Sequence, residues 1–156
     1  MVAYSFKERF VGAIMAGLEW SPDLTLPTFD GPLTPKRQTI RALGRRRHAR
    51  PGDQLQLYVG LRTKQCRLIG RARCVRTREI LIGFRRERIH IGPAPDVPRT
   101  SIIESEGLLA FARKDGFRSW SEMKRFWAET HNEGRKRKTL PPSRFIGVLI
   151  EWEPIP

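Results

Sequence analysis

Basic side chains are concentrated in one short stretch near the start of the chain. Between residues 36 and 50 there are seven Lys or Arg and no Asp or Glu. A guanidinium group donates paired hydrogen bonds to phosphate oxygens, so a stretch of this kind is typical of proteins that contact a nucleic-acid backbone. Solubility alone is better served by a surface of mixed charge. The sequence therefore predicts phosphate contacts by Arg37, Arg41, Arg45, Arg46 and Arg47.

A second group of basic residues lies in a segment with the alternation of a β-strand. From residue 62 to residue 88 there are ten Lys or Arg against two Glu. Small or apolar residues at positions 66, 68, 70, 72 and 74 alternate with others, as in a half-buried strand. The opposite face of that strand carries Arg67, Arg71 and Arg73, which we also expect to contact phosphates.

The charge of the whole chain favours a polyanionic partner. The 156 residues include 30 Lys or Arg and 16 Asp or Glu, a formal net charge of +14. Membrane surfaces are also anionic, but no stretch approaches the roughly 20 apolar residues of a spanning helix, and the N-terminus has no secretory signal pattern. We expect a soluble cytoplasmic protein with a polyanionic partner and no membrane association.

Metal and cofactor sites are not indicated. The two cysteines, Cys66 and Cys74, occur without a close Cys or His cluster, and we expect both to be reduced thiols in the core. The three histidines, His48, His90 and His131, are scattered singly. We therefore expect neither a metal nor a cofactor.

The first half of the chain predicts one helix followed by strands. Ser5-Phe6-Lys7-Glu8 has the form of a capping box, and the helix that it begins is expected to end at Gly17. A proline-rich loop then occupies residues 18–35. We expect strands at 38–43, at 55–59 after the turn Pro51-Gly52-Asp53, at 66–74, and within 77–91.

The second half predicts two more helices and a closing strand. Capping boxes at Ser101 to Glu104 and at Ser119 to Glu122 mark the helix starts. Trp120, Met123 and Trp127 have the spacing of an inward-facing stripe. A basic loop follows at 132–142, and the apolar run 145–152 supplies the last strand. The sequence thus predicts one α+β domain over residues 1–156.

Several of these motifs resemble the ASCH family. Its members have a helix ending in glycine, then a lysine, then a Thr-Ile-Arg or related triplet in the first strand, and Lys36 to Arg41 reads Lys-Arg-Gln-Thr-Ile-Arg. The segment 51–58 looks like the Gly-Asp motif of the family, and 115–126 looks like its late acidic turn and helix. The resemblance covers most of the chain in the right order. It implies a PUA-like small mixed β-barrel of about five to six strands flanked by three helices.

The resemblance also implies a cleft where Lys36, Thr39 and Asp115 converge. Small bacterial members of the family are amidohydrolases that remove the acetyl group from the exocyclic amine of acetylated cytidine, and others are described as RNA-binding proteins or ribonucleases. Carried over to this chain, Lys36 would be the general base, Thr39 the nucleophile and Asp115 the orienting carboxylate. Asp115 stands where the hydrolase pattern has a glutamate.

A lysine can act as a base only in its neutral form. Neighbouring arginines would favour that form of Lys36, whereas a nearby Asp115 would favour the ammonium, and the sequence does not decide between them. A simpler interpretation is that Lys36 and Arg41 bind phosphate, Thr39 fills a strand position and Asp115 begins a turn.

Three functions stay open at this stage. The first is an RNA-binding domain with a basic cleft that accepts a nucleobase or nucleotide, with Tyr58 among its nucleic-acid-binding residues. Its partner would be RNA or a modified nucleoside. The second is an enzyme, either the deacetylase or a metal-independent ribonuclease acting through Lys36 and Tyr58. The third is an interaction module bound to RNA-containing machinery. The charge of +14 favours a polymer over a free nucleoside.

Overall fold

The computed structural model describes residues 1–19, 34–131 and 142–155. These form a mixed α+β structure with a seven-stranded sheet and three α-helices. The strands are β1 (Val2–Phe6), β2 (Gln38–Ala42), β3 (Gln54–Val59), β4 (Arg67–Gly83), β5 (Arg88–Ile91), β6 (Ser101–Glu104) and β7 (Phe145–Pro154). The helices are the short 3-10 helix η1 (Glu8–Phe10), α1 (Val11–Leu18), α2 (Glu106–Lys114) and α3 (Trp120–Thr130). Most of the predicted loops at 18–35 and 132–142 lies outside the described residues.

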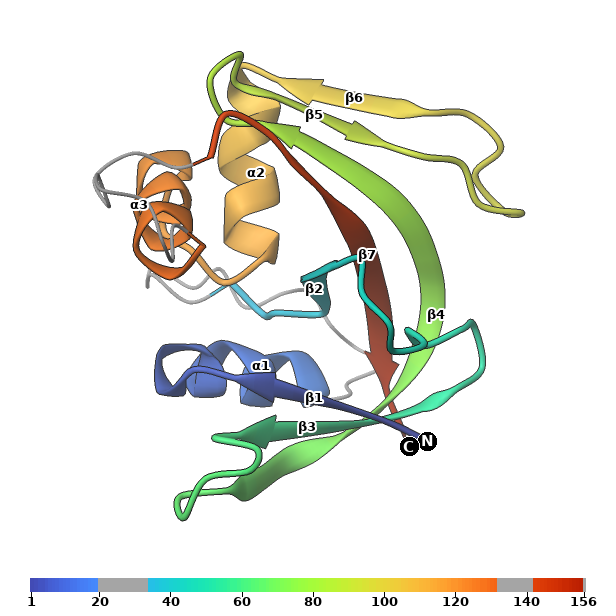
Figure 1. Cartoon of the computed structure of the whole chain (residues 1–156). Helices are drawn as coiled ribbons and strands as arrows, with labels where there is room; N and C mark the ends of the chain where they lie inside the picture. The colour runs from blue at the N-terminus through green and yellow to red at the C-terminus, as the bar shows by residue number, and fades with distance from the viewer. Residues whose placement is uncertain (20–33, 132–141, 156) are drawn as a thin grey trace.

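The sheet is organised around the long strand β4. One edge of β4 pairs with β3 and then with β5, and the other edge pairs with β7. β1 adds to β3 in parallel, while β2 adds to β7 and β6 to β5 in antiparallel fashion. Figure 1 shows β4 and β7 curving together along the right-hand side, with the three helices on the concave side. Fully buried core side chains such as Ile14, Leu57, Ile82 and Met123 come from both layers.

The predicted barrel of five to six strands is wrong. The sheet has seven strands and is not closed, because no backbone ladder joins β1 to β2 in the described part of the chain. A side chain bridges these strands instead, since Arg41 Nη2 on β2 donates to the carbonyl of Ser5 on β1 at 2.8 Å. The guanidinium of Arg41 also lies over the rings of Tyr4 and Phe6. Arg41 therefore joins β2 to β1 through its side chain and not through backbone pairing.

The predicted capping box at Ser5 is wrong as well. Ser5 lies in β1, and its Oγ accepts a hydrogen bond from the amide of Leu61 at 3.1 Å. Tyr4 and Phe6 alternate into the core, and this burial favours a strand over the local helix signal. The α-helix begins only at Val11 and ends at Leu18, one residue beyond Gly17.

The other two capping boxes have opposite outcomes. Ser101 to Glu104 forms β6, because these residues pair with β5, and α2 begins at Glu106. Ser119 is confirmed as the N-cap of α3, since its Oγ accepts from the amide of Glu122 at 3.1 Å. The inward stripe of Trp120, Met123 and Trp127 is confirmed by their burial.

The two strands expected at 66–74 and within 77–91 are largely one continuous strand, β4, with β5 following at its end. Ala72 and Cys74 are buried as predicted, but Cys66 and Leu68 are exposed, so Cys66 is not a core thiol. The register between β3 and β4 shifts at Leu57 and Tyr58, and such a bulge changes which residues of a strand face the core. The strands predicted at 38–43, 55–59 and 145–152 are confirmed.

No helix among the described residues is long and apolar enough to cross a membrane.

Candidate functional site

Lys36 lies where the chain passes from α1 into β2. Its amide donates to the carbonyl of Ala13 on α1 at 2.8 Å. Gly17 permits this approach, because a Cβ atom on Gly17 would lie 2.2 Å from the carbonyl oxygen of Lys36. The glycine that the sequence indicated as a helix end therefore serves as a contact surface for the lysine segment. Lys36 itself is 2% exposed.

Asp115 lies at the end of α2 and meets Lys36 across the core. Its amide completes the last turn of α2, and Gly116 then takes the left-handed conformation with φ of +95°. Lys36 Nζ donates to Asp115 Oδ1 at 3.0 Å and to the Asp115 carbonyl at 2.5 Å. Asp115 is 6% exposed, so the two residues form a buried ion pair. Segments 79 residues apart thus supply one polar centre.

Burial shifts both members of this pair toward their neutral forms. Burial lowers the pKa of Lys36, against the opposing effect of the Asp115 carboxylate. Burial likewise raises the pKa of Asp115, against the effects of Lys36, Arg41 and the nearby amide of Gln38. The ammonium also lies 5.1 Å from the centre of the Phe10 ring. Desolvation therefore favours the neutral amine and the neutral carboxyl, while the contact between the two groups favours their charged forms.

Two buried polar groups beside the pair lack partners. Arg41 Nε and Gln38 Nε2 make no hydrogen bond with any described residue, although Gln38 lies close enough to affect Asp115. A buried donor without an acceptor is costly, so such groups often receive one from a ligand. Of these two residues, Arg41 lines the cavity described next, so its Nε is the unsatisfied donor that a ligand there could partner.

A cavity of about 810 Å³ opens beside these residues, and we call it the cleft. Its volume lies in the usual range for small-molecule sites. It brings together Lys36, Thr39, Arg41 and Asp115, which the sequence had proposed as site residues. Its apolar walls include four phenylalanines that the sequence did not assign to a site, namely Phe6, Phe10, Phe117 and Phe126.

Thr39 shares the cleft with Lys36 but is not joined to it by a hydrogen bond. Thr39 is 4% exposed, and it lies on the same face of β2 as Arg41, two residues further along the strand. Within the described residues, the Thr39 hydroxyl has no hydrogen-bond partner, whereas Lys36 Nζ is occupied by Asp115. The threonine is therefore free to donate to a ligand.

The other predicted phosphate contacts are divided between paired and unpaired arginines. Arg37 donates to the carbonyls of Gly17 and Glu19 at the end of α1. Arg47, Arg67 and Arg73 form ion pairs with Asp53, Glu8 and Glu153. Arg45, Arg46 and Arg71 are exposed and form no ion pair with the described residues. Tyr58 bonds Gln56 at 3.3 Å and is not among the described residues that line the cleft.

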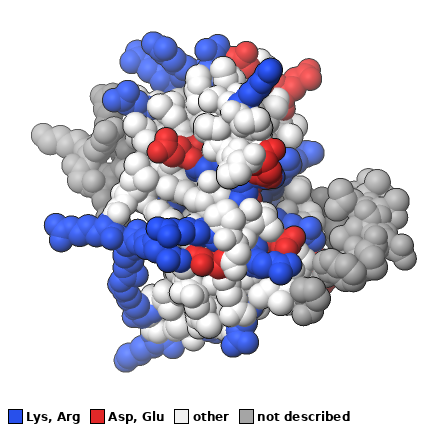
Figure 2. Space-filling model, turned by 90° about the vertical axis from the view of Figure 1, so that its right-hand side faces the viewer, with Lys and Arg blue, Asp and Glu red and all other residues white. Residues whose placement is uncertain are grey.

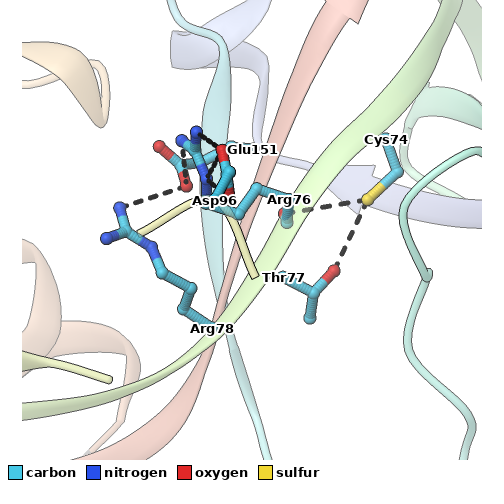
Figure 3. A network of polar contacts seen from close by, with 6 residues as sticks. All are labelled: Cys74, Arg76, Thr77, Arg78, Asp96 and Glu151. Atoms are coloured by element: carbon cyan, nitrogen blue, oxygen red, sulfur yellow. Dashed lines mark hydrogen bonds and ion pairs between the residues drawn. The ribbon is translucent and has the colours of Figure 1, made fainter. Parts of the chain in front are cut away.

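The basic segment 62–88 is neutralised in part by acids from elsewhere in the chain. Figure 3 shows Arg76 and Arg78 on β4 pointing toward Glu151 on β7, with Asp96 completing the network. Five of the ten basic residues in this segment are ion-paired in this way: Arg67, Arg73, Arg76, Arg78 and Arg88. Figure 2 shows Lys and Arg spread over the face on the right of Figure 1, with Asp and Glu between them. This face does not carry one continuous basic patch.

No family model, curated protein or solved structure matches the chain. The assignment of the cleft therefore depends on its geometry and charge. Within the described residues, no three His, Cys, Asp or Glu side chains lie together as a metal site would require. The site is built from a buried ion pair, unsatisfied donors and aromatic rings.

Proposed function

We propose that the protein binds RNA and takes one nucleobase into the cleft. The observation that carries the proposal is the cavity of about 810 Å³ in which the Lys36–Asp115 pair, Thr39 and Arg41 lie among phenylalanine rings. Sequence-specific RNA-binding proteins stack unpaired bases on aromatic or guanidinium planes and form hydrogen bonds with base edges. The cleft contains both kinds of group.

The polar groups of the cleft suit the edge of a base. Arg41 Nε donates to no acceptor among the described residues, and the Thr39 hydroxyl can donate or accept a hydrogen bond. The Asp115 carboxylate can accept a hydrogen bond from an exocyclic amine. A base that satisfies these groups replaces the water that the buried donors would otherwise need.

The net charge of +14 supports a polymer as the ligand. Phosphate neutralisation contributes most of the non-specific affinity of nucleic-acid-binding proteins. Arg45, Arg46 and Arg71 are exposed and not ion-paired within the described residues, so they can contact phosphates without breaking an internal ion pair.

The test is the affinity of the protein for single-stranded RNA, measured by fluorescence anisotropy. We expect Arg41→Gln to weaken binding by at least tenfold, because it removes an unsatisfied donor and a cation from the cleft. The control is Arg99→Gln, which removes an equal charge from an exposed residue outside the cleft. Circular dichroism would establish that both variants fold. Equal, small losses in the two variants would contradict binding in the cleft.

A second candidate function is hydrolysis of the acetyl amide of acetylated cytidine. It is favoured by the lowered pKa of Lys36 in the same cavity as Thr39. Neutral Lys36 would remove the proton of the Thr39 hydroxyl, whose oxygen would attack the acetyl carbon. The cytidine amine would leave with that proton, and water would release acetate from Thr39.

This chemistry requires Lys36 to turn from Asp115 toward Thr39, since no hydrogen bond joins them now. Thr39→Val keeps the size of the side chain and should abolish acetate release, whereas Thr100→Val at an exposed position outside the cleft should not. Turnover that survives Thr39→Val would contradict the hydrolase mechanism. Ribonuclease chemistry through Lys36 and Tyr58 has no comparable support, because Tyr58 is not among the residues that line the cleft.

We also propose that the chain is a distant ASCH member with a PUA-like arrangement. The support is the order of its elements, in which a helix contacts a lysine before the Thr-Ile-Arg strand and an acidic turn reaches that lysine. An open sheet would then be a departure from the family pattern.

A further inference from the structure

A second cavity of about 730 Å³ is also lined by Arg41, and we call it the outer cavity. It shares Ser5, Arg41 and Leu61 with the cleft, so the two cavities are neighbours along the seam between β1 and β2. Its lining includes four arginines, whereas the lining of the cleft includes several phenylalanines. The polar and basic side chains that line it are those of Tyr4, Arg41, Arg46, Arg47, His48 and Arg62.

The outer cavity is strongly cationic. Four guanidinium groups line it, and no Asp or Glu is among the described residues that do so. Arg47 forms an ion pair with Asp53, whereas Arg46 and Arg62 form none within the described chain. Four like charges around one concave surface repel one another unless an anion lies between them.

Arg62 is held beside this cavity in an unfavourable backbone conformation. Its φ of +72° lies in the left-handed region, which a non-glycine residue rarely adopts. Hydrogen bonds from the amide and hydroxyl of Thr63 to the carbonyl of Gly60 close the turn, and Leu61 is tied to Ser5 of β1. Strained residues held in this way are concentrated at ligand sites. The turn therefore fixes Arg62 at the cavity.

We propose that the outer cavity binds the phosphate ester of the nucleotide whose base lies in the cleft. This inference rests on the proposed function. Guanidinium groups form paired, charge-assisted hydrogen bonds with phosphate oxygens. Arg41 lies between the two cavities, with its Nη2 on Ser5 and its Nε unsatisfied, so it separates the base from the phosphate. The phosphate is supplied either by a free nucleotide or by an RNA chain.

The first experiment compares ligands that differ by one phosphate. Calorimetry would measure the affinities of the four common nucleosides and acetylcytidine, of their 3′- and 5′-monophosphates, and of dinucleotides joined by one phosphodiester. We expect at least one phosphate to increase affinity by tenfold or more. This gain should fall below threefold in Arg46→Gln/Arg62→Gln. It should persist in Arg86→Gln/Arg99→Gln, which removes the same charge from exposed residues outside both cavities.

Equal gains in the two double variants would overturn the proposal. A gain confined to monophosphates assigns the cavity to free nucleotides, whereas an equal gain with the phosphodiester assigns it to RNA; either result supports a phosphate-ester site.

If no nucleoside or nucleotide binds, the proposed function fails. The binding of inorganic phosphate then tests the outer cavity by itself. At matched ionic strength, phosphate but not chloride should shift the side-chain Nε–H signals of Arg46 and Arg62 in ¹⁵N spectra. Identical spectra in both salts would overturn the phosphate site independently of the cleft.

Discussion

At the scale of single residues, the Lys36–Asp115 pair is the most unusual feature of the molecule. Both side chains are removed from water, and the cost of desolvating two charges often cancels their attraction. A hydrophobic pair of similar size would therefore stabilise the core at least as well. Its position at the cleft gives the pair a functional explanation, because it places an amine and a carboxyl at the wall of a cavity.

Replacing Asp115 by asparagine should destabilise the fold strongly. The change leaves the buried Lys36 amine without its carboxylate, and breaking a buried pair in this way costs about 3–5 kcal/mol. Urea unfolding at pH 7 would measure the change. The matched control is Asp96→Asn, since Asp96 forms an exposed ion pair with Arg76 and its loss should have little effect. Comparable destabilisation by both substitutions would contradict this account.

The same variant should change how stability depends on pH. Burial lowers the pKa of folded Lys36 below its ordinary value of 10.5, and removal of Asp115 lowers it further. Between the folded and unfolded pKa values the unfolded lysine binds more protons, so stability rises with pH over that window. The window is wider in Asp115→Asn, whose free energy of unfolding should therefore increase more from pH 7 to pH 10 than that of the wild type. Parallel pH profiles would show that Lys36 remains charged without its partner.

At the scale of elements, α1 positions the lysine through a contact that needs glycine. Gly17→Ala would place a methyl group 2.2 Å from the Lys36 carbonyl oxygen, so α1 and the start of β2 must separate. We expect destabilisation of about 1–3 kcal/mol, as for other overpacked sites, measured by thermal or urea unfolding. Gly44→Ala is the control, because a Cβ there meets nothing within 4 Å. Wild-type stability in Gly17→Ala would refute the close contact.

The elements also show which features could be predicted from the sequence. The strand at 55–59 and the stripe on α3 were predictable, because periodicity records which side of an element is buried. β1 was not, since Ser5 to Glu8 carries a genuine helix-start signal that parallel pairing with β3 overrides. A local window could not anticipate this pairing, because β3 begins about 50 residues later.

The site was predictable in the same partial way. The resemblance selected Lys36, Thr39 and Asp115, which do line one cavity. The phenylalanine walls were missed, because their convergence depends on how η1, the turn after α2 and α3 pack together. Arg67 and Arg73 were predicted to contact phosphates because their segment is basic. In the fold they form ion pairs with Glu8 and Glu153. Which acidic residue lies beside which arginine depends on the fold, and a short stretch of sequence does not contain this information.

At the scale of the whole molecule, the net charge of +14 remains although many arginines are ion-paired. An RNA that neutralises exposed arginines releases counterions, so log affinity should fall linearly with log salt concentration. The slope for a single strand is about −0.7 for each phosphate contact. We expect Arg45→Gln/Arg46→Gln/Arg71→Gln to reduce the slope by about 2 in magnitude, as three lost contacts imply.

The matched control for this slope is Arg86→Gln/Arg99→Gln/Arg125→Gln, which removes the same charge from exposed residues elsewhere. The slope of this control should stay close to that of the wild type. Equal reductions in both triple variants would mean that the whole surface, and not the proposed arginines, contacts the RNA.

The most direct test of the account is the location of RNA on the folded protein, mapped by backbone chemical shifts during titration with single-stranded RNA. We predict the largest shifts around the cleft, in residues 4–10, 36–42 and 115–117. Shifts confined to the convex face of β4 and β7, with the cleft unaffected, would contradict the claim that the cleft accepts a nucleobase.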